Sequence, residues 1–139
     1  MDVNGYFLFI AITVIGFYLL DIVSSLLNLK ALKPELPAAF TDIYDAEKYA
    51  NSQAYTRETT RFGFLESTVS LVIFLAFWWL QGFQWLDGLA RGFDQGPIIT
   101  GLIFVSLLTI GGQILSLPFN LCDTFVLEEK YGFNKTTPK

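Results

Sequence analysis

Three polar side chains interrupt the long apolar stretches of this sequence, and they are the first residues to consider for chemistry. They are Asp21, Glu66 and Gln113. Each residue lies at a similar distance from the end of its stretch that would meet the same side of a membrane. Asp21 is 16 residues from Gly5, Glu66 is 15 from Gln81, and Gln113 is 16 from Pro97. At 1.5 Å per residue these separations are roughly 22–24 Å, so membrane-spanning helices would bring all three to one depth of a core ~30 Å thick.

Two interpretations of this polar layer are open. In the first, the three side chains snorkel to cytoplasmic water, because each lies within about two helical turns of that surface. In the second, Asp21, Glu66 and Gln113 line a hydrated chamber that opens to the cytoplasm, as intramembrane carboxylates often do. Two carboxylates without a third ligand or a histidine are not evidence of catalysis, so we assign no catalytic residue.

The residues that are missing exclude several kinds of site. The chain has no histidine, so it lacks the usual general base and the commonest zinc ligand, and we expect no metal site or cofactor in this chain. Cys122 is the only cysteine, which excludes an internal disulfide and a multi-cysteine metal site. The net charge of -4 offers no basic surface for nucleic acid.

The elements that carry the polar layer are three apolar blocks at about 5–27, 62–80 and 97–117. Hydrophobic residues make up 53% of the chain and charged residues 16%, against about 25% charged in ordinary globular proteins. Each block is long enough to cross a bilayer. We predict an all-α integral membrane protein with three transmembrane helices, in contact with the lipid bilayer. The first block fits a signal peptide poorly, because Asp2 stands where a signal peptide carries Lys or Arg.

The polar segments between the blocks complete a single membrane module, residues 1–139. The loop 28–61 should be largely helical from Thr41 or Asp42, and no Pro or Gly separates this helix from the second span until Gly63. The glycine-containing connection 81–96 favours a flexible or interfacial loop over a dimerisation face. Pro118 should close the third block, which leaves a polar tail at 118–139.

The distribution of Lys and Arg predicts the orientation. The 28–61 loop and the 118–139 tail hold eight of the nine basic residues, and the 81–96 connection holds only Arg91. The positive-inside rule therefore places the loop and tail in the cytoplasm and the N-terminus outside. Nothing resembles a eukaryotic retention signal, so we expect a bacterial inner membrane, with the endoplasmic reticulum as the alternative.

The tail contains the most specific motif in the chain. LPF at 117–119 and TFVLEEKYGFNKTT at 124–137 closely resemble a stretch in the N-terminal membrane region of the type I CAAX prenyl protease family. NSQAYTR at 51–57, followed by Arg61 and Phe62, is similar to that family's first cytoplasmic loop. Thr59 departs from the pattern, which commonly has lysine there.

The resemblance implies a multi-span helical protein that encloses a large chamber, with zinc near the cytoplasmic side. The family's H-E-x-x-H motif supplies two zinc ligands and a general base for peptide hydrolysis. Those residues lie downstream of the matched region, and this chain has no histidine to which they could be assigned. The zinc therefore belongs to the full-length family enzyme.

The residues that do correspond are those of the tail motif: Glu128, Glu129, Gly132, Phe133, Asn134 and Thr137. Structurally, they would form an elbow, with a tight turn at Gly132 and a helix cap from Asn134 or Thr137. The alternative function for the motif brings Glu128 or Asn134 near the substrate or the groups around the zinc.

We therefore predict the N-terminal transmembrane module of a zinc metalloendopeptidase, a peptidase N-terminal domain that walls the chamber and is itself inactive. Its partner would be the catalytic half of the same polypeptide, because Thr137 and Pro138 resemble a helix start and suggest that the natural chain continues. The alternative is a non-catalytic accessory subunit of a larger membrane assembly. The reading frame after Lys139 distinguishes the two.

Overall fold

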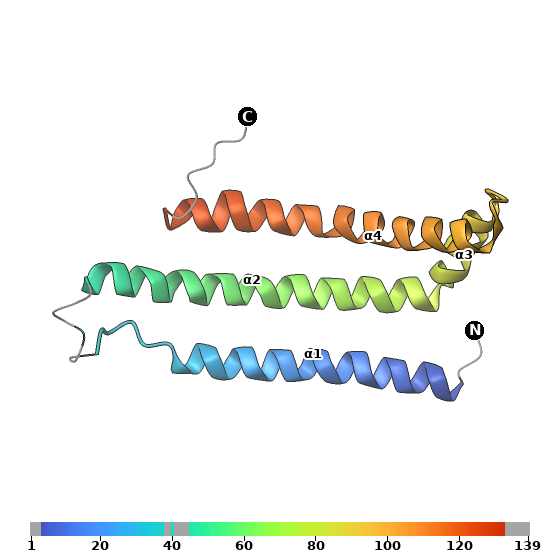
Figure 1. Cartoon of the computed structure of the whole chain (residues 1–139). Helices are drawn as coiled ribbons and strands as arrows, with labels where there is room; N and C mark the ends of the chain where they lie inside the picture. Colours follow the sequence, from blue (N-terminus) through green and yellow to red (C-terminus); the bar gives the residue numbers. More distant parts are fainter. Residues whose placement is uncertain (1–3, 38–39, 41–44, 133–139) are drawn as a thin grey trace.

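Three long antiparallel helices form one layer, with α2 in the middle (Figure 1). The computed structural model describes residues 4–37, 40 and 45–132. Its elements are α1 (Gly5–Ala31), α2 (Ala46–Trp79), α3 (Gly82–Arg91), α4 (Gly96–Cys122) and a π-helix, η2 (Asp123–Glu128). The described residues contain no strand, so the predicted all-α fold is confirmed.

The exposed side chains identify the chain as an integral membrane protein. Three helical stretches, Gly5–Ala31, Ala46–Trp79 and Gly96–Glu128, are long and apolar enough to cross a membrane. Among the described residues only Leu86 and Ala90 are buried apolar side chains, whereas large ones such as Phe9 and Ile98 are 71% and 79% exposed. A soluble monomer rarely exposes so much continuous apolar surface, which a bilayer would cover. The span boundaries given above stay predictions.

Side-chain caps determine where the first two helices begin. The Asn4 side chain accepts a hydrogen bond from the backbone N–H of Phe7 at 2.9 Å, and Asp45 accepts one from that of Glu47 at 2.9 Å. Each cap satisfies an N–H group that has no partner within its helix. From Ala46, α2 runs unbroken into the second apolar block, as predicted. The predicted start at Thr41 or Asp42 lies outside the described residues.

The connection at 81–96 is largely helical, so the prediction of a loop was wrong, whereas its predicted interfacial position stays a prediction. It contains the helix α3, whose residues Gly82, Leu86 and Ala90 are buried. Their spacing of four puts them on one side of the helix, where they pack against the ends of α2 and α4. The glycines of this connection favoured the prediction of a loop and so obscured the amphipathic pattern. Burial of one face stabilises a helix that propensity alone would not.

The prediction that Pro118 closes the third helix was also wrong. Helix α4 continues through Pro118 to Cys122 and leads directly into η2. A proline inside a helix removes one backbone hydrogen bond and crowds the preceding turn. Contacts beyond it offset that cost, because the ring of Phe119 lies 6.1 Å from that of Phe62 on α2. Residues 118–128 of the predicted polar tail are therefore helical.

Candidate functional site

The register of α1 against α2 is set by contacts along their length. The ring of Phe7 lies 4.5 Å from that of Trp78, and the hydroxyl groups of Tyr18 and Thr68 are 2.7 Å apart. Thr68 donates its only hydroxyl proton to the carbonyl oxygen of Phe64 at 2.6 Å, so Tyr18 is the donor to Thr68. A polar contact thus joins the two helices within their apolar blocks.

This register brings Asp21 and Glu66 to similar levels. Asp21 follows Tyr18 by three residues, and Glu66 precedes Thr68 by two, in helices of opposite direction. Both residues are therefore displaced toward the same end of the pair, by about 4.5 Å and 3 Å. Asp21 is exposed, and helical geometry places it roughly 60° around the axis from Tyr18, at the flank of the interface.

Glu66 lies on the other side of α2, toward α4. Its helical neighbours on that side are Phe62, which contacts Phe119, and Ser70 and Ile73, which line a groove between α2 and α4. Glu66 is half-buried. Of the three residues in the predicted polar layer, it alone shares a helix side with this groove.

Gln113 lies on the side of α4 that faces away from the groove. The helical period aligns it with Ile110 and Leu117, which are 57% and 52% exposed. Gln113 itself is exposed. The described residues therefore do not bring Asp21, Glu66 and Gln113 together around one space, and their role as chamber-lining residues stays a prediction.

The groove between α2 and α4 has a volume of about 510 Å³ and an apolar lining. Phe74 and Phe77 of α2, Phe83 of α3 and Leu108 of α4 contribute to its walls. Gly111 and Gly112 also line it, where the lack of side chains leaves room between the helices. The chain thus presents a hollowed apolar surface on the same side as Glu66.

A cluster of charged and aromatic side chains joins η2 to α2 at the opposite end from α3. Lys130 Nζ lies 2.6 Å from Glu58 Oε1 and 2.8 Å from Glu58 Oε2, so both carboxylate oxygens accept hydrogen bonds from one ammonium group. The rings of Tyr55 and Tyr131 meet edge to face at 5.5 Å. We call these four residues the clasp.

The clasp changes the electrostatics of its own members. The hydrogen bond to Glu58 raises the pKa of Lys130, because the carboxylate stabilises the charged amine. Desolvation is the largest cause that raises the pKa of Tyr131, and the hydrogen bond to Glu58 is the next. At neutral pH, the clasp therefore holds a lysine cation and a neutral phenol.

The tail motif flanks the clasp residues Lys130 and Tyr131 in the sequence. Glu128 is half-buried at the last position of η2, and Glu129 is exposed. Gly132 has a φ of 75°, a left-handed conformation that glycine adopts without strain, and its N–H donates to the carbonyl oxygen of Glu129. Phe133, Asn134 and Thr137 lie outside the described residues, so their predicted capping and substrate roles stay predictions.

Asp123 is a further unusual polar residue, which sequence reasoning missed. Its Oδ1 atom is buried without a hydrogen-bond partner, at the first position of η2. π-helical turns are rare and frequently mark functional positions. No sequence signal identified this position, since neither hydropathy nor spacing predicts an i→i+5 turn.

The described residues do not form a group that fits a zinc site. The described part of the chain contains no group of three or more His, Cys, Asp or Glu side chains that could hold a metal ion. The full sequence has no histidine, and the single cysteine, Cys122, is exposed on α4. Structural and catalytic zinc sites need at least three such protein ligands.

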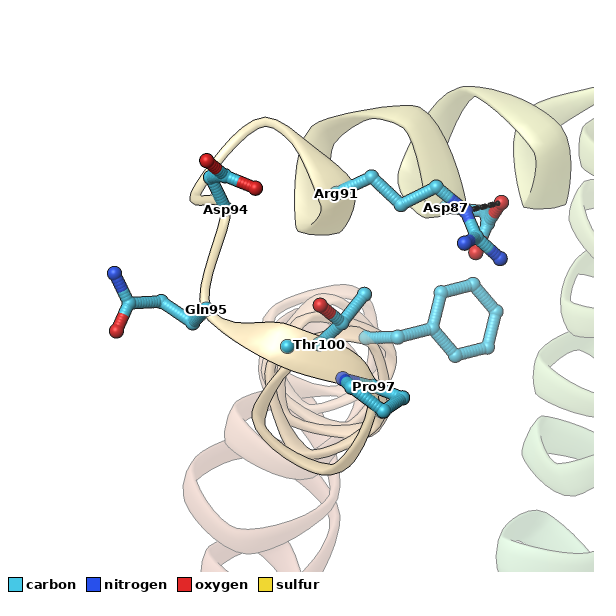
Figure 2. Close-up of a pocket in the computed structure, with 9 residues that line it drawn as sticks. Asp87, Arg91, Asp94, Gln95, Pro97 and Thr100 are labelled. Carbon is cyan, nitrogen blue, oxygen red and sulfur yellow. Dashed lines mark hydrogen bonds and ion pairs between the residues drawn. The ribbon is translucent and has the colours of Figure 1, made fainter.

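A second pocket, of about 480 Å³ and lined by both polar and apolar residues, lies where α3 meets the start of α4 (Figure 2). Arg91 Nε donates to Asp87 Oδ2 at 2.7 Å, and this hydrogen bond raises the pKa of the arginine. Asp94 adds a second carboxylate. Because Arg91 is already paired, the pocket has no free cation among its lining residues to bind an anion.

Comparison with known proteins gives a consistent result. The family described as CAAX prenyl protease N-terminal, five membrane helices, matches residues 25–139. Probable CAAX prenyl protease 1 of Schizosaccharomyces pombe is 33% identical over 121 residues, which are 78% of this chain and 26% of that protein. The CAAX prenyl protease 1 homolog of Arabidopsis thaliana is 35% identical over 137 residues, 90% of this chain and 32% of that protein.

A solved structure agrees with the sequence relatives. The crystal structure of S. mikatae Ste24p superposes with a TM-score of 0.84 at 25% identity, over 99% of this chain and 33% of that chain. The chain thus spans a quarter to a third of the length of the proteins it matches.

Proposed function

The chain belongs to the CAAX prenyl protease family, in its N-terminal membrane region, and from this premise we propose that it serves a zinc metalloendopeptidase as a non-catalytic wall. In the natural protein, the three long helices would border an intramembrane chamber, and the segment after η2 would lead into a catalytic half. The observation that carries the proposal is the superposition of nearly this whole chain on one third of Ste24p.

The zinc chemistry would come from residues beyond this chain. The bound metal of the resembled family activates water for peptide hydrolysis. Without histidine, residues 1–139 supply no ligand set for it, so their contribution is to enclose and position. Glu66 and the groove between α2 and α4 are the part of the chain best suited to face the chamber, because a half-buried carboxylate lies there beside an apolar hollow.

We further propose that the N-terminus faces the outside and that the start of α2 and the clasp face the cytoplasm. The bond between Glu58 and Lys130 supports this, because it brings the basic loop and the basic tail to one end of the helix layer. The relatives named above come from eukaryotes, which supports the endoplasmic reticulum over the bacterial inner membrane.

Peptide hydrolysis by the natural polypeptide that contains residues 1–139 tests the proposal. We expect the purified protein in lipid vesicles to cleave a prenylated CAAX peptide, to lose this activity with a zinc chelator, and to regain it when zinc is restored. Residues 1–139 alone should cleave nothing. Zinc-dependent cleavage by residues 1–139 alone, or a natural polypeptide that never hydrolyses peptide, would contradict the proposal; the latter would favour an accessory subunit.

A further inference from the structure

We propose that Lys130 and Glu58 are positioning residues: they lock the end of η2 to α2 and so set the direction in which the chain leaves toward the catalytic half. This inference rests on the proposed function. It assigns a role to the charged pair itself, which neither the tail motif nor the family match assigns.

Two consecutive residues, Lys130 and Tyr131, make the contacts of the clasp with α2. Lys130 binds both oxygens of Glu58, which fixes the ammonium group more narrowly than a single hydrogen bond would. The next residue, Tyr131, places its ring against that of Tyr55, one turn away from Glu58 on α2. Lys130 Nζ also lies 5.4 Å from the centre of the Tyr131 ring. These contacts together restrict rotation of the last turn about its axis.

The π-helix explains how Tyr131 reaches α2. In an unbroken α-helix, Tyr131 would lie roughly 120° around the axis from Phe119, which faces α2. A π-turn holds about one extra residue, which reduces the accumulated rotation by about 100°. Tyr131 therefore returns to the side of Phe119. The π-turn in η2 therefore allows the contacts of the clasp to form.

The exposure of the pair indicates a geometric role rather than a large effect on folding. The Lys130 and Glu58 side chains are 55% and 34% exposed. Ion pairs with this exposure contribute little to the free energy of unfolding, because water screens them and two long side chains lose freedom. What the pair does supply is one defined orientation of the final helical turn.

That orientation is passed directly to the departing chain. Tyr131 N–H donates to the carbonyl oxygen of Leu127 at 3.4 Å, and Gly132 then turns the backbone with its positive φ. Only Tyr131 separates Gly132 from Lys130. A rotation of the last helical turn would therefore change the direction of the chain after Gly132. Displacements of about 1 Å at a distant catalytic group can reduce turnover by about 100-fold.

Charge exchange in the full-length natural protein tests the role of the pair. The variants are Lys130→Glu, Glu58→Lys, the double exchange and Lys130→Arg, with Arg91→Glu as a control that breaks an exposed ion pair at the other end of the molecule. For each we would measure kcat and KM for peptide hydrolysis, bound zinc and thermal stability.

We expect each single reversal to lower kcat about tenfold or more, with unchanged zinc content and little change in melting temperature. The double exchange should restore most of the lost kcat, and Lys130→Arg should retain most of the parent kcat. Arg91→Glu should behave as the parent. Single reversals within about twofold of the parent, or a double exchange as impaired as the singles, would overturn the inference.

A cross-linking measurement separates this inference from the proposed function. Cysteines at positions 55 and 131, in a background without other cysteines, should be joined by a short bifunctional thiol reagent. The yield should fall in Lys130→Glu and return in the double exchange, whether or not the protein cleaves peptide. A parent without peptidase activity would refute the proposed function alone; an unchanged cross-link in Lys130→Glu would refute the clasp.

Discussion

Gly82 shows how closely the chain approaches itself at the junction of α2 and α3. A Cβ atom at this position would overlap the ring of Phe77, which also packs edge to face with Phe83 at 5.0 Å. Gly88, in the same helix, has no atom within 4 Å of where its Cβ would be. Of the two glycines of α3, Gly82 is therefore required for space, whereas Gly88 is not.

We predict opposite effects from alanine at these two glycines. Gly82→Ala should destabilise the protein by about 1–3 kcal/mol, because the methyl group forces the Phe77 ring out of place. Gly88→Ala should stabilise it by up to about 1 kcal/mol, since alanine favours a helix. Thermal unfolding in detergent measures both. Equal melting temperatures for the two variants would mean that Gly82 does not pack as described.

The raised pKa of Lys130 gives a second prediction at this scale. Acylation requires the neutral amine, so Lys130 should react at higher pH in the parent than in Glu58→Gln, as followed by mass spectrometry. A group whose folded pKa is raised stabilises the folded state fully below its ordinary pKa, about 10.4, and loses that effect as the pH rises through the raised folded pKa. The clasp should therefore persist across neutral pH. Identical acylation profiles in parent and Glu58→Gln would show that the bond does not form.

The positions and contacts of individual residues were only partly predictable from the sequence. Counting residues along the helices predicts one depth for Asp21, Glu66 and Gln113, because helical rise is constant. It could not indicate direction, since that depends on which side of each helix packs, and Gln113 faces away from the groove. Glu58 and Lys130 are far apart in the sequence, and no spacing rule connects them.

The beginnings of the helices are governed by local signals. Asp45 precedes α2 and its carboxylate accepts hydrogen bonds from the N–H groups of Glu47 and Lys48, at 2.9 Å and 3.4 Å. Acidic caps also interact favourably with the helix dipole. This capped end carries the polar part of α2, which includes Glu58.

Asp45→Ala should therefore unravel the first turn of α2. We expect faster amide hydrogen exchange at Glu47 and Lys48 and a loss of about 0.5–2 kcal/mol, with no change in the membrane-embedded part of the helix. Asp45→Asn is the matched control, since asparagine caps as well as aspartate. Should the alanine variant exchange at the parent rate, the cap does not hold this end.

Removal of one residue from η2 tests the rotation argument. Val126 is 59% exposed, and its deletion should convert the π-turn to an α-helix and rotate Tyr131 away from α2. Cross-linking between positions 55 and 131 should be lost, whereas cross-linking between 62 and 119, which precede the deletion, should remain. Val126→Ala keeps the length and should retain both. Loss of neither cross-link in the deletion variant would contradict the role of η2.

Element types were predicted better than element ends. Apolar length alone identified the three long helices, because a bilayer demands that length. The sequence did not predict α3, whose burial depends on packing against α2 and α4, or the continuation through Pro118, which contacts such as that of Phe119 with Phe62 support. Tertiary packing overrode local signals in both cases.

At the scale of the whole molecule, the helix layer has little interior of its own. Helices α2 and α4 meet at their two ends, through α3 at one end and through η2 at the other, and leave the apolar groove between them. A wall of this form requires further protein or lipid on its faces. This is the basis for our proposal that the module encloses a chamber jointly with other parts of a larger protein.

The most direct test of the central claim separates the wall from the catalytic part. Residues 1–139 and the remainder of the natural protein would be expressed as two polypeptides in one membrane, together and singly, and zinc-dependent peptide hydrolysis measured. We predict cleavage only when both are present, with neither polypeptide active alone. Full activity of the remainder without residues 1–139 would contradict a role for this chain as a necessary wall.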